Sequence, residues 1–172
     1  MAVAVVIGLA SAGCVWGLHH ELDRAMGPAA LGWGALFSLT PALPLVALFW
    51  WVGTPQREPR WLLLVAVLWG GLAATYIALK LNAWLAIQVG DVYQASARSA
   101  VFVAPWVEEA AKGTIIFAIV LWRKHDFNAV VAGVVYGGLV GTAFAFTENL
   151  VYYGPLFQEW HDAKGTGAAL SA

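Results

Sequence analysis

Residues 128–153 read NAVVAGVVYGGLVGTAFAFTENLVYY, and Glu148 is the one side chain among them that is charged at neutral pH. As a helix this stretch would extend about 39 Å at 1.5 Å per residue. The hydrocarbon core of a bilayer is only about 30 Å thick and needs roughly 20 apolar residues to cross it. The stretch therefore predicts a transmembrane helix.

Earlier parts of the chain have the same character and length. We expect four further transmembrane helices, at about 1–18, 29–53, 61–80 and 101–122. The mixed segment 81–100 is expected to be an interfacial or re-entrant helix, and 158–172 a polar, then Gly/Ala-rich tail. The predicted fold class is all-α: a polytopic transmembrane helix bundle with about five spans, forming a single domain over 1–157.

Composition supports this class. Apolar residues make up 61% of the 172 residues and charged ones 11%, against roughly 45–50% and about 25% in soluble domains. The net charge of −1 and the lack of a basic run exclude nucleic acid as a partner. Cys14 is the only cysteine, which excludes an internal disulfide. We expect a multi-pass protein of the cell (inner) membrane, surrounded by membrane lipid.

The stretch 101–122 contains three charged residues near its middle: Glu108, Glu109 and Lys112. A charge at mid-bilayer costs about 2.5–3.5 kcal/mol on insertion scales, so three together are expected to face the bundle interior. Lys112 is four residues after Glu108 and three after Glu109, so it can pair with either acid. A glutamate beside a lysine is a candidate general acid or base; the alternative is an ion pair that only holds helices together.

Small residues recur at every fourth position of 128–153: Gly133, Gly137, Gly141 and Ala145. Such a stripe is typical of close helix packing. Near its end lie Glu148 and Asn149, and Phe144 precedes Glu148 by one turn on the same face. Glu108 and Glu148 would lie about 10 Å and about 8 Å from the same membrane face, at 1.5 Å per residue. We therefore expect one polar pocket between these two helices.

The segments APWVEEAAKG (104–113) and DFNAVVAGVVYGGLVGTAFAFTENLVYY (126–153) resemble the PrsW family of bacterial intramembrane proteases. This family is related to the CAAX-prenyl endopeptidases and to the Aph subunit of gamma-secretase. The matching motifs are E-E-x-x-K and F-x-x-x-E-N, here formed by Glu108, Glu109, Lys112, Phe144, Glu148 and Asn149.

The resemblance implies a membrane-embedded peptidase that cleaves membrane-anchored proteins of the anti-sigma-factor type. It implies that Glu108, Glu109 and Glu148 are catalytic and polarise the attacking water. Lys112, Asn149 and Phe144 would have supporting roles.

His161, just beyond 128–153, is the histidine with a route to the acids, and it is a further supporting candidate. Three glutamates and one histidine could hold a divalent metal such as zinc, or activate water without any metal. Both alternatives stay open. The family's pattern continues with histidine-bearing motifs on later helices, so we expect these residues to be either a truncated fragment or a variant lacking part of the catalytic set.

Two other functions remain alternatives to an intramembrane endopeptidase. The small-residue stripe suits a non-catalytic membrane scaffold or assembly subunit. Buried Glu and Lys side chains also occur in proton- or ion-conducting bundles.

Overall fold

The structure is a computed structural model and describes residues 2–54, 58–88, 103–122 and 129–170. These residues are almost entirely helical and include no strand, so the predicted all-α class is confirmed. The elements in chain order are α1 (Ala2–Ala25), α2 (Pro28–Gly53), α3 (Arg60–Leu68), η1 (Trp69–Ala74), α4 (Thr75–Gln88), α6 (Ala104–Trp122) and α7 (Ala129–Leu170). The three elements α3, η1 and α4 form one continuous rod, in which η1 is a π-helical turn.

Three helices in the described part of the chain are long and apolar enough to cross a membrane: Pro28–Gly53, Arg60–Gln88 and Val130–Lys164. They contain the predicted spans 29–53 and 61–80 and nearly all of 128–153. Two of these helices continue past the predicted ends, to Gln88 and, in α7, to Leu170. The remaining part of the predicted interfacial segment, 89–100, lies outside the described residues. The predicted spans 1–18 and 101–122 correspond to α1 and α6, whose crossing of the membrane stays a prediction.

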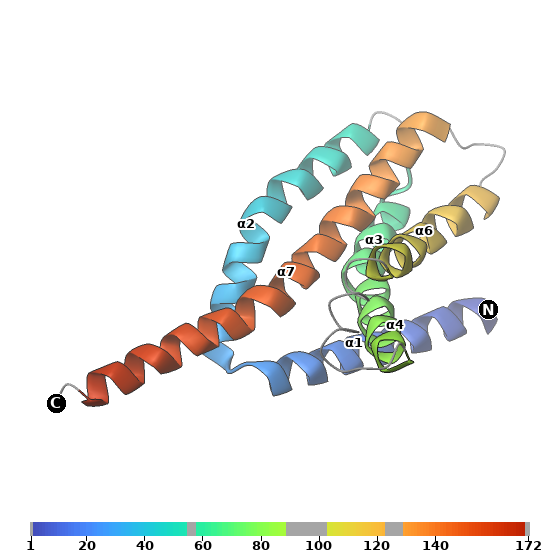
Figure 1. Cartoon of the computed structure of the whole chain (residues 1–172). Coiled ribbons are helices and arrows are strands. Elements are labelled where there is room, and N and C mark those ends of the chain that lie inside the picture. The colour runs from blue at the N-terminus through green and yellow to red at the C-terminus, as the bar shows by residue number, and fades with distance from the viewer. Residues whose placement is uncertain (1, 55–57, 89–102, 123–128, 171–172) are drawn as a thin grey trace.

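The helices α2 and α7 lie side by side over most of the length of α2 (Figure 1). The far C-terminal part of α7 extends beyond the other helices (Figure 1). Gly27, just before α2, donates its backbone N–H to Gln158 Oε1 of α7 at 3.2 Å. Packing is close here because Gly34 of α2 lies against Leu150 and Gly154 of α7.

The main core lies where α3, α6 and α7 meet. It is made of fully or nearly fully buried side chains: Leu62, Leu63, Ala66, Ile119, Ala132, Val135, Tyr136, Leu139 and Val140. At its edge, the buried carboxylate of Glu58 accepts a 2.6 Å hydrogen bond from the Tyr136 hydroxyl. This bond ties the segment just before α3 to the N-terminal part of α7.

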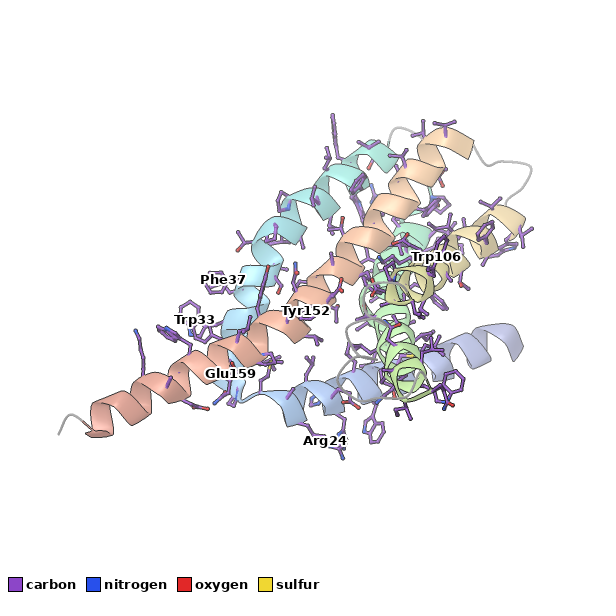
Figure 2. All side chains as sticks on the ribbon, in the orientation of Figure 1. Arg24, Trp33, Phe37, Trp106, Tyr152 and Glu159 are labelled. Atoms are coloured by element: carbon purple, nitrogen blue, oxygen red, sulfur yellow. The ribbon has the colours of Figure 1, made fainter. Side chains whose placement is uncertain are left out.

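Large apolar side chains cover the outside of the bundle (Figure 2). Trp106 of α6 is 79% exposed and Trp51 of α2 is 70% exposed. An apolar surface of this extent marks a membrane or partner interface, not a water-facing exterior. The rod and α7 instead bury about half of their most apolar windows inside the bundle.

The π-helical turn η1 touches α7 backbone to backbone. Its sequence begins Trp-Gly-Gly, and a Cβ atom added at Gly70 would lie 2.2 Å from the carbonyl oxygen of Val140. At Gly71 the added atom would lie 3.3 Å from the carbonyl oxygen of Ala143. Only residues without a side chain permit this approach. The turn thus brings the rod against the part of α7 that precedes Glu148.

Candidate active site

Lys112 is the centre of a polar cluster on α6. Its Nζ atom donates a 2.8 Å hydrogen bond to Glu109 Oε1 and lies 4.0 Å from Glu108 Oε2. The side chains of Lys112 and Glu108 are 19% and 22% exposed, whereas that of Glu109 is 72% exposed. Glu108 is therefore the more buried of the two glutamates, and the exposed Glu109 accepts the hydrogen bond of the lysine.

The same lysine connects α6 to α7. Its Nζ atom lies 4.2 Å from the centre of the Phe144 ring, which is itself buried. A cation over an aromatic face is attracted by the ring quadrupole, most strongly where water is excluded. One turn further along α7 lies the half-buried Glu148, close enough to Glu108 and Lys112 for their charges to act on it. The structure thus brings together two carboxylates from different helices, one ammonium group and one aromatic ring.

The rod packs behind this cluster. Trp69 donates its indole N–H to the carbonyl oxygen of Ala111 on α6 at 2.9 Å. Thr147 of α7 donates its hydroxyl to the carbonyl oxygen of Gly71 at 2.6 Å. Sequence reasoning missed Trp69 and Thr147; the Gly-Gly pair inside an otherwise apolar span indicates a close helix approach but does not identify these two residues.

Other predicted site residues lie apart from the cluster. The helix α7 continues without a break through His161, which is exposed and 13 positions after Glu148, or about 20 Å along the axis. Its Nδ1 atom lies 3.8 Å from the neighbouring Asp162 carboxylate. The structure therefore does not bring His161 to the acids. Asn149 is half-buried beside Glu148 on α7.

The small-residue stripe of α7 is not closely packed by the described residues. Cβ atoms added at Gly133 or Gly141 would meet no described atom within 4 Å. One added at Gly137 would lie 3.8 Å from Ile116 Cδ1 of α6, an ordinary contact. No described helix therefore packs closely against these three glycines.

A hydrolytic zinc site generally has three protein ligands and a water molecule. The described residues contain no group of three His, Cys, Asp or Glu side chains placed to hold one metal ion. Glu108 and Glu148 could supply carboxylate ligands, but Glu109 is largely exposed and is paired with Lys112. The residues described here do not make up a complete metal site.

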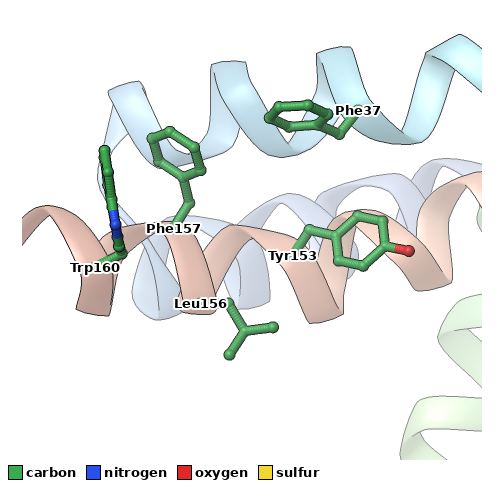
Figure 3. Close-up of a pocket in the computed structure, with 5 residues that line it drawn as sticks. All are labelled: Phe37, Tyr153, Leu156, Phe157 and Trp160. Atoms are coloured by element: carbon green, nitrogen blue, oxygen red, sulfur yellow. The ribbon is translucent and has the colours of Figure 1, made fainter.

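A separate apolar groove of about 540 Å³ lies on the outside of α2 and α7. Figure 3 shows the side chains that line it: Phe37, Tyr153, Leu156, Phe157 and Trp160. Trp33 of α2 stacks on Phe157 with ring centres 5.6 Å apart. Among the described residues, no carboxylate or ammonium group lines the groove, so it is distinct from the polar cluster and suits contact with lipid.

The fold and the cluster define a membrane-embedded helix bundle with paired carboxylates between two helices, a class of site suited to general acid–base chemistry. The family described as the PrsW family intramembrane metalloprotease matches residues 58–172, so the chain belongs to this family. Membership places it among the intramembrane proteases, which hydrolyse peptide bonds, and the matched region contains η1, α6 and α7. No curated protein and no solved structure gives a significant match.

Proposed function

We propose that the chain is an intramembrane endopeptidase of the cell (inner) membrane that cleaves membrane-anchored proteins, of the anti-sigma-factor type by family resemblance. The observation that carries the proposal is the meeting of Glu108, Lys112, Phe144 and Glu148 across α6 and α7. Charged groups inside a bundle are costly and mark functional sites by default. Glu108 and Glu148 also reach the cluster from α6 and α7, two helices that follow one another in the chain.

The proposed reaction uses the two sheltered carboxylates in sequence. Glu108 accepts a proton from a water molecule as the water oxygen bonds to the carbonyl carbon of the scissile peptide. A proton then passes to the leaving nitrogen and the C–N bond breaks. Glu148 is the second carboxyl group at the site that can take part in this proton transfer. The products are a free carboxylate and a free amine.

Lys112 would stabilise charge during this reaction. Its ammonium group has three N–H donors, and Glu109 accepts one of them. Another can point to the oxygen of the tetrahedral intermediate, since preorganised donors stabilise developing negative charge. Phe144 limits the positions open to the ammonium group because the Nζ atom lies over its ring.

A cleavage assay in proteoliposomes with a single-span substrate tests this proposal. Glu108→Gln and Glu148→Gln should each lower kcat/KM by about 10²- to 10⁴-fold, the usual contribution of a general acid or base. Glu109→Gln should cost less, because Glu109 is largely exposed. Glu159→Gln is the matched control: this residue is exposed on α7, well away from the cluster (Figure 2). Normal cleavage by both the Glu108 and Glu148 variants would refute the proposal.

A non-catalytic scaffold is the second candidate, and the open stripe on α7 favours it. Cβ atoms added at Gly133 and Gly141 would meet no described atom within 4 Å, so a partner helix could approach there. If the chain is a scaffold, Gly133→Leu and Gly141→Leu should abolish co-purification of a membrane partner, while the glutamate variants keep it. Retained association in both glycine variants would remove this candidate.

A further inference from the structure

The turn η1 is the one described element that donates or accepts a side-chain hydrogen bond with both acid-bearing helices. On one side, Trp69 bonds to the Ala111 carbonyl, directly before Lys112. On the other side, the Gly71 carbonyl accepts from Thr147, directly before Glu148. Each hydrogen bond is therefore one residue away from a charged member of the cluster, on a different helix.

The π-helical geometry of η1 makes this double contact possible. A π-turn inserts a residue into the helix and disturbs the usual ladder of backbone hydrogen bonds, and such turns occur frequently at functional sites. Here the Gly70 carbonyl accepts a 2.9 Å bond from the Thr75 hydroxyl, and the Gly71 carbonyl accepts from Thr147. Both oxygens are buried, so a partner is needed to offset their desolvation. The hydroxyl of Thr147 supplies it to Gly71 from the neighbouring helix.

Apolar packing fixes the same arrangement. A small buried cluster joins the rod to both helices: Ala74, Ala78, Ala111 and Phe144, with Trp69, Ile77 and Val107 against it. Phe144 belongs to this cluster and also lies under the Lys112 ammonium. Sliding α6 along α7 would therefore break at least one of the two hydrogen bonds that hold them to the rod, open the cluster and remove the ring from beneath the lysine.

We propose that η1 sets the axial register of α6 against α7, and that Trp69 and Thr147 are positioning residues for Glu108 and Glu148. The inference rests on the proposed function for its effect on catalysis. Neither residue touches the reacting atoms; each acts through the carbonyl or helix that it holds. Misplacing reacting groups by about 1 Å can cost about 10²-fold in rate, so a shift of the two helices should reach the chemistry.

The first test compares kinetic constants in the cleavage assay. Thr147→Val removes the hydroxyl with little change of shape, and Trp69→Phe removes the indole N–H. Each should lower kcat about 10- to 100-fold and leave KM within about twofold, whereas Thr147→Ser should keep kcat within about threefold because its hydroxyl can still reach Gly71. The controls are Trp84→Phe, at an exposed position of α4, and Thr142→Val, at a buried position of α7. Equal losses in Thr147→Val and Thr147→Ser would overturn the proposal.

The second test needs no catalytic activity. Spin labels are attached at Leu121→Cys on α6 and Leu156→Cys on α7, both exposed positions, in a Cys14→Ser background. The inter-label distance distribution should broaden or move by up to about one helical turn, about 5 Å, in Trp69→Phe and Thr147→Val but not in Thr147→Ser. Unchanged distributions in both variants would overturn the proposal. If the wild type cleaves nothing, the proposed function fails, and the distances alone decide the register.

Discussion

Replacing Gly70 with alanine would force backbone atoms of η1 and α7 into a direct clash. The new Cβ atom would lie 2.2 Å from the carbonyl oxygen of Val140 and 2.9 Å from its Cα atom. Favourable non-bonded contacts between heavy atoms fall at about 3.5–4.0 Å, so η1 and α7 must separate by roughly 1 Å or more. Backbone atoms on both sides cannot rotate away as a flexible side chain could. Overpacking of this kind costs about 1–3 kcal/mol.

The matched control is Gly32→Ala in α2. A Cβ atom at Gly32 meets no described atom within 4 Å, so alanine there should gain about 0.5–1 kcal/mol from its better helix propensity. The two variants should thus differ by about 1.5–4 kcal/mol in unfolding free energy. Tryptophan fluorescence during SDS-driven unfolding in mixed micelles measures this difference. If Gly70→Ala is as stable as Gly32→Ala, the close approach of η1 to α7 is wrong.

Two further outcomes follow from polar contacts outside the cluster. Tyr136→Phe removes a hydrogen bond to the buried Glu58 carboxylate and should destabilise the fold by about 1.5–3 kcal/mol. Tyr153→Phe, at an exposed position, should change stability little. Unfolding in mixed micelles measures both variants, and equal stabilities would contradict the buried hydrogen bond. The hydrogen bond and charge of Lys80 lower the pKa of Glu21, at the end of α1, so this pair stabilises the packing of α1 above the ordinary Glu pKa of about 4.3. That stabilisation should disappear as the pH falls through the lowered pKa, and Glu21→Gln should abolish this pH dependence in a protease-protection assay of α1; a dependence that survives the substitution would refute the assignment.

The membrane helices could be predicted because bilayer thickness is a one-dimensional constraint on chain length. Apolar runs alone were enough for 29–53 and 61–80, which became α2 and most of the rod. The end of the rod could not be predicted from hydropathy.

Only the similar membrane depth of Glu108 and Glu148 could be predicted from the sequence. Equal distances from one membrane face suggested that Glu108 and Glu148 share a pocket, but the spacing could not distinguish the roles of the neighbouring glutamates. The structure separates them by exposure, with Glu108 sheltered and Glu109 open and bound to Lys112. Likewise, His161 is close to the acids in sequence order but not in space, because α7 remains helical and carries it away along the axis.

The π-turn was not predictable from a single sequence. Gly70 and Gly71 weaken a helix in isolation, and what they permit is visible only when α7 is placed against them. The indole of Trp69 similarly reads as lipid-facing apolar bulk until its N–H is seen bonded to Ala111. Tertiary contacts therefore determine both the geometry of η1 and its relation to the cluster.

The most direct test of the central claim is a kinetic double-mutant cycle on Glu108 and Glu148 in the proteoliposome cleavage assay. Residues that act as one catalytic unit show strongly non-additive losses. If the two carboxylates act as one unit, Glu108→Gln, Glu148→Gln and the double variant should all fall to nearly the same low kcat. A double variant whose loss equals the product of two independent single losses, or single variants that cleave like the wild type, would contradict the claim that these two carboxylates form one active site.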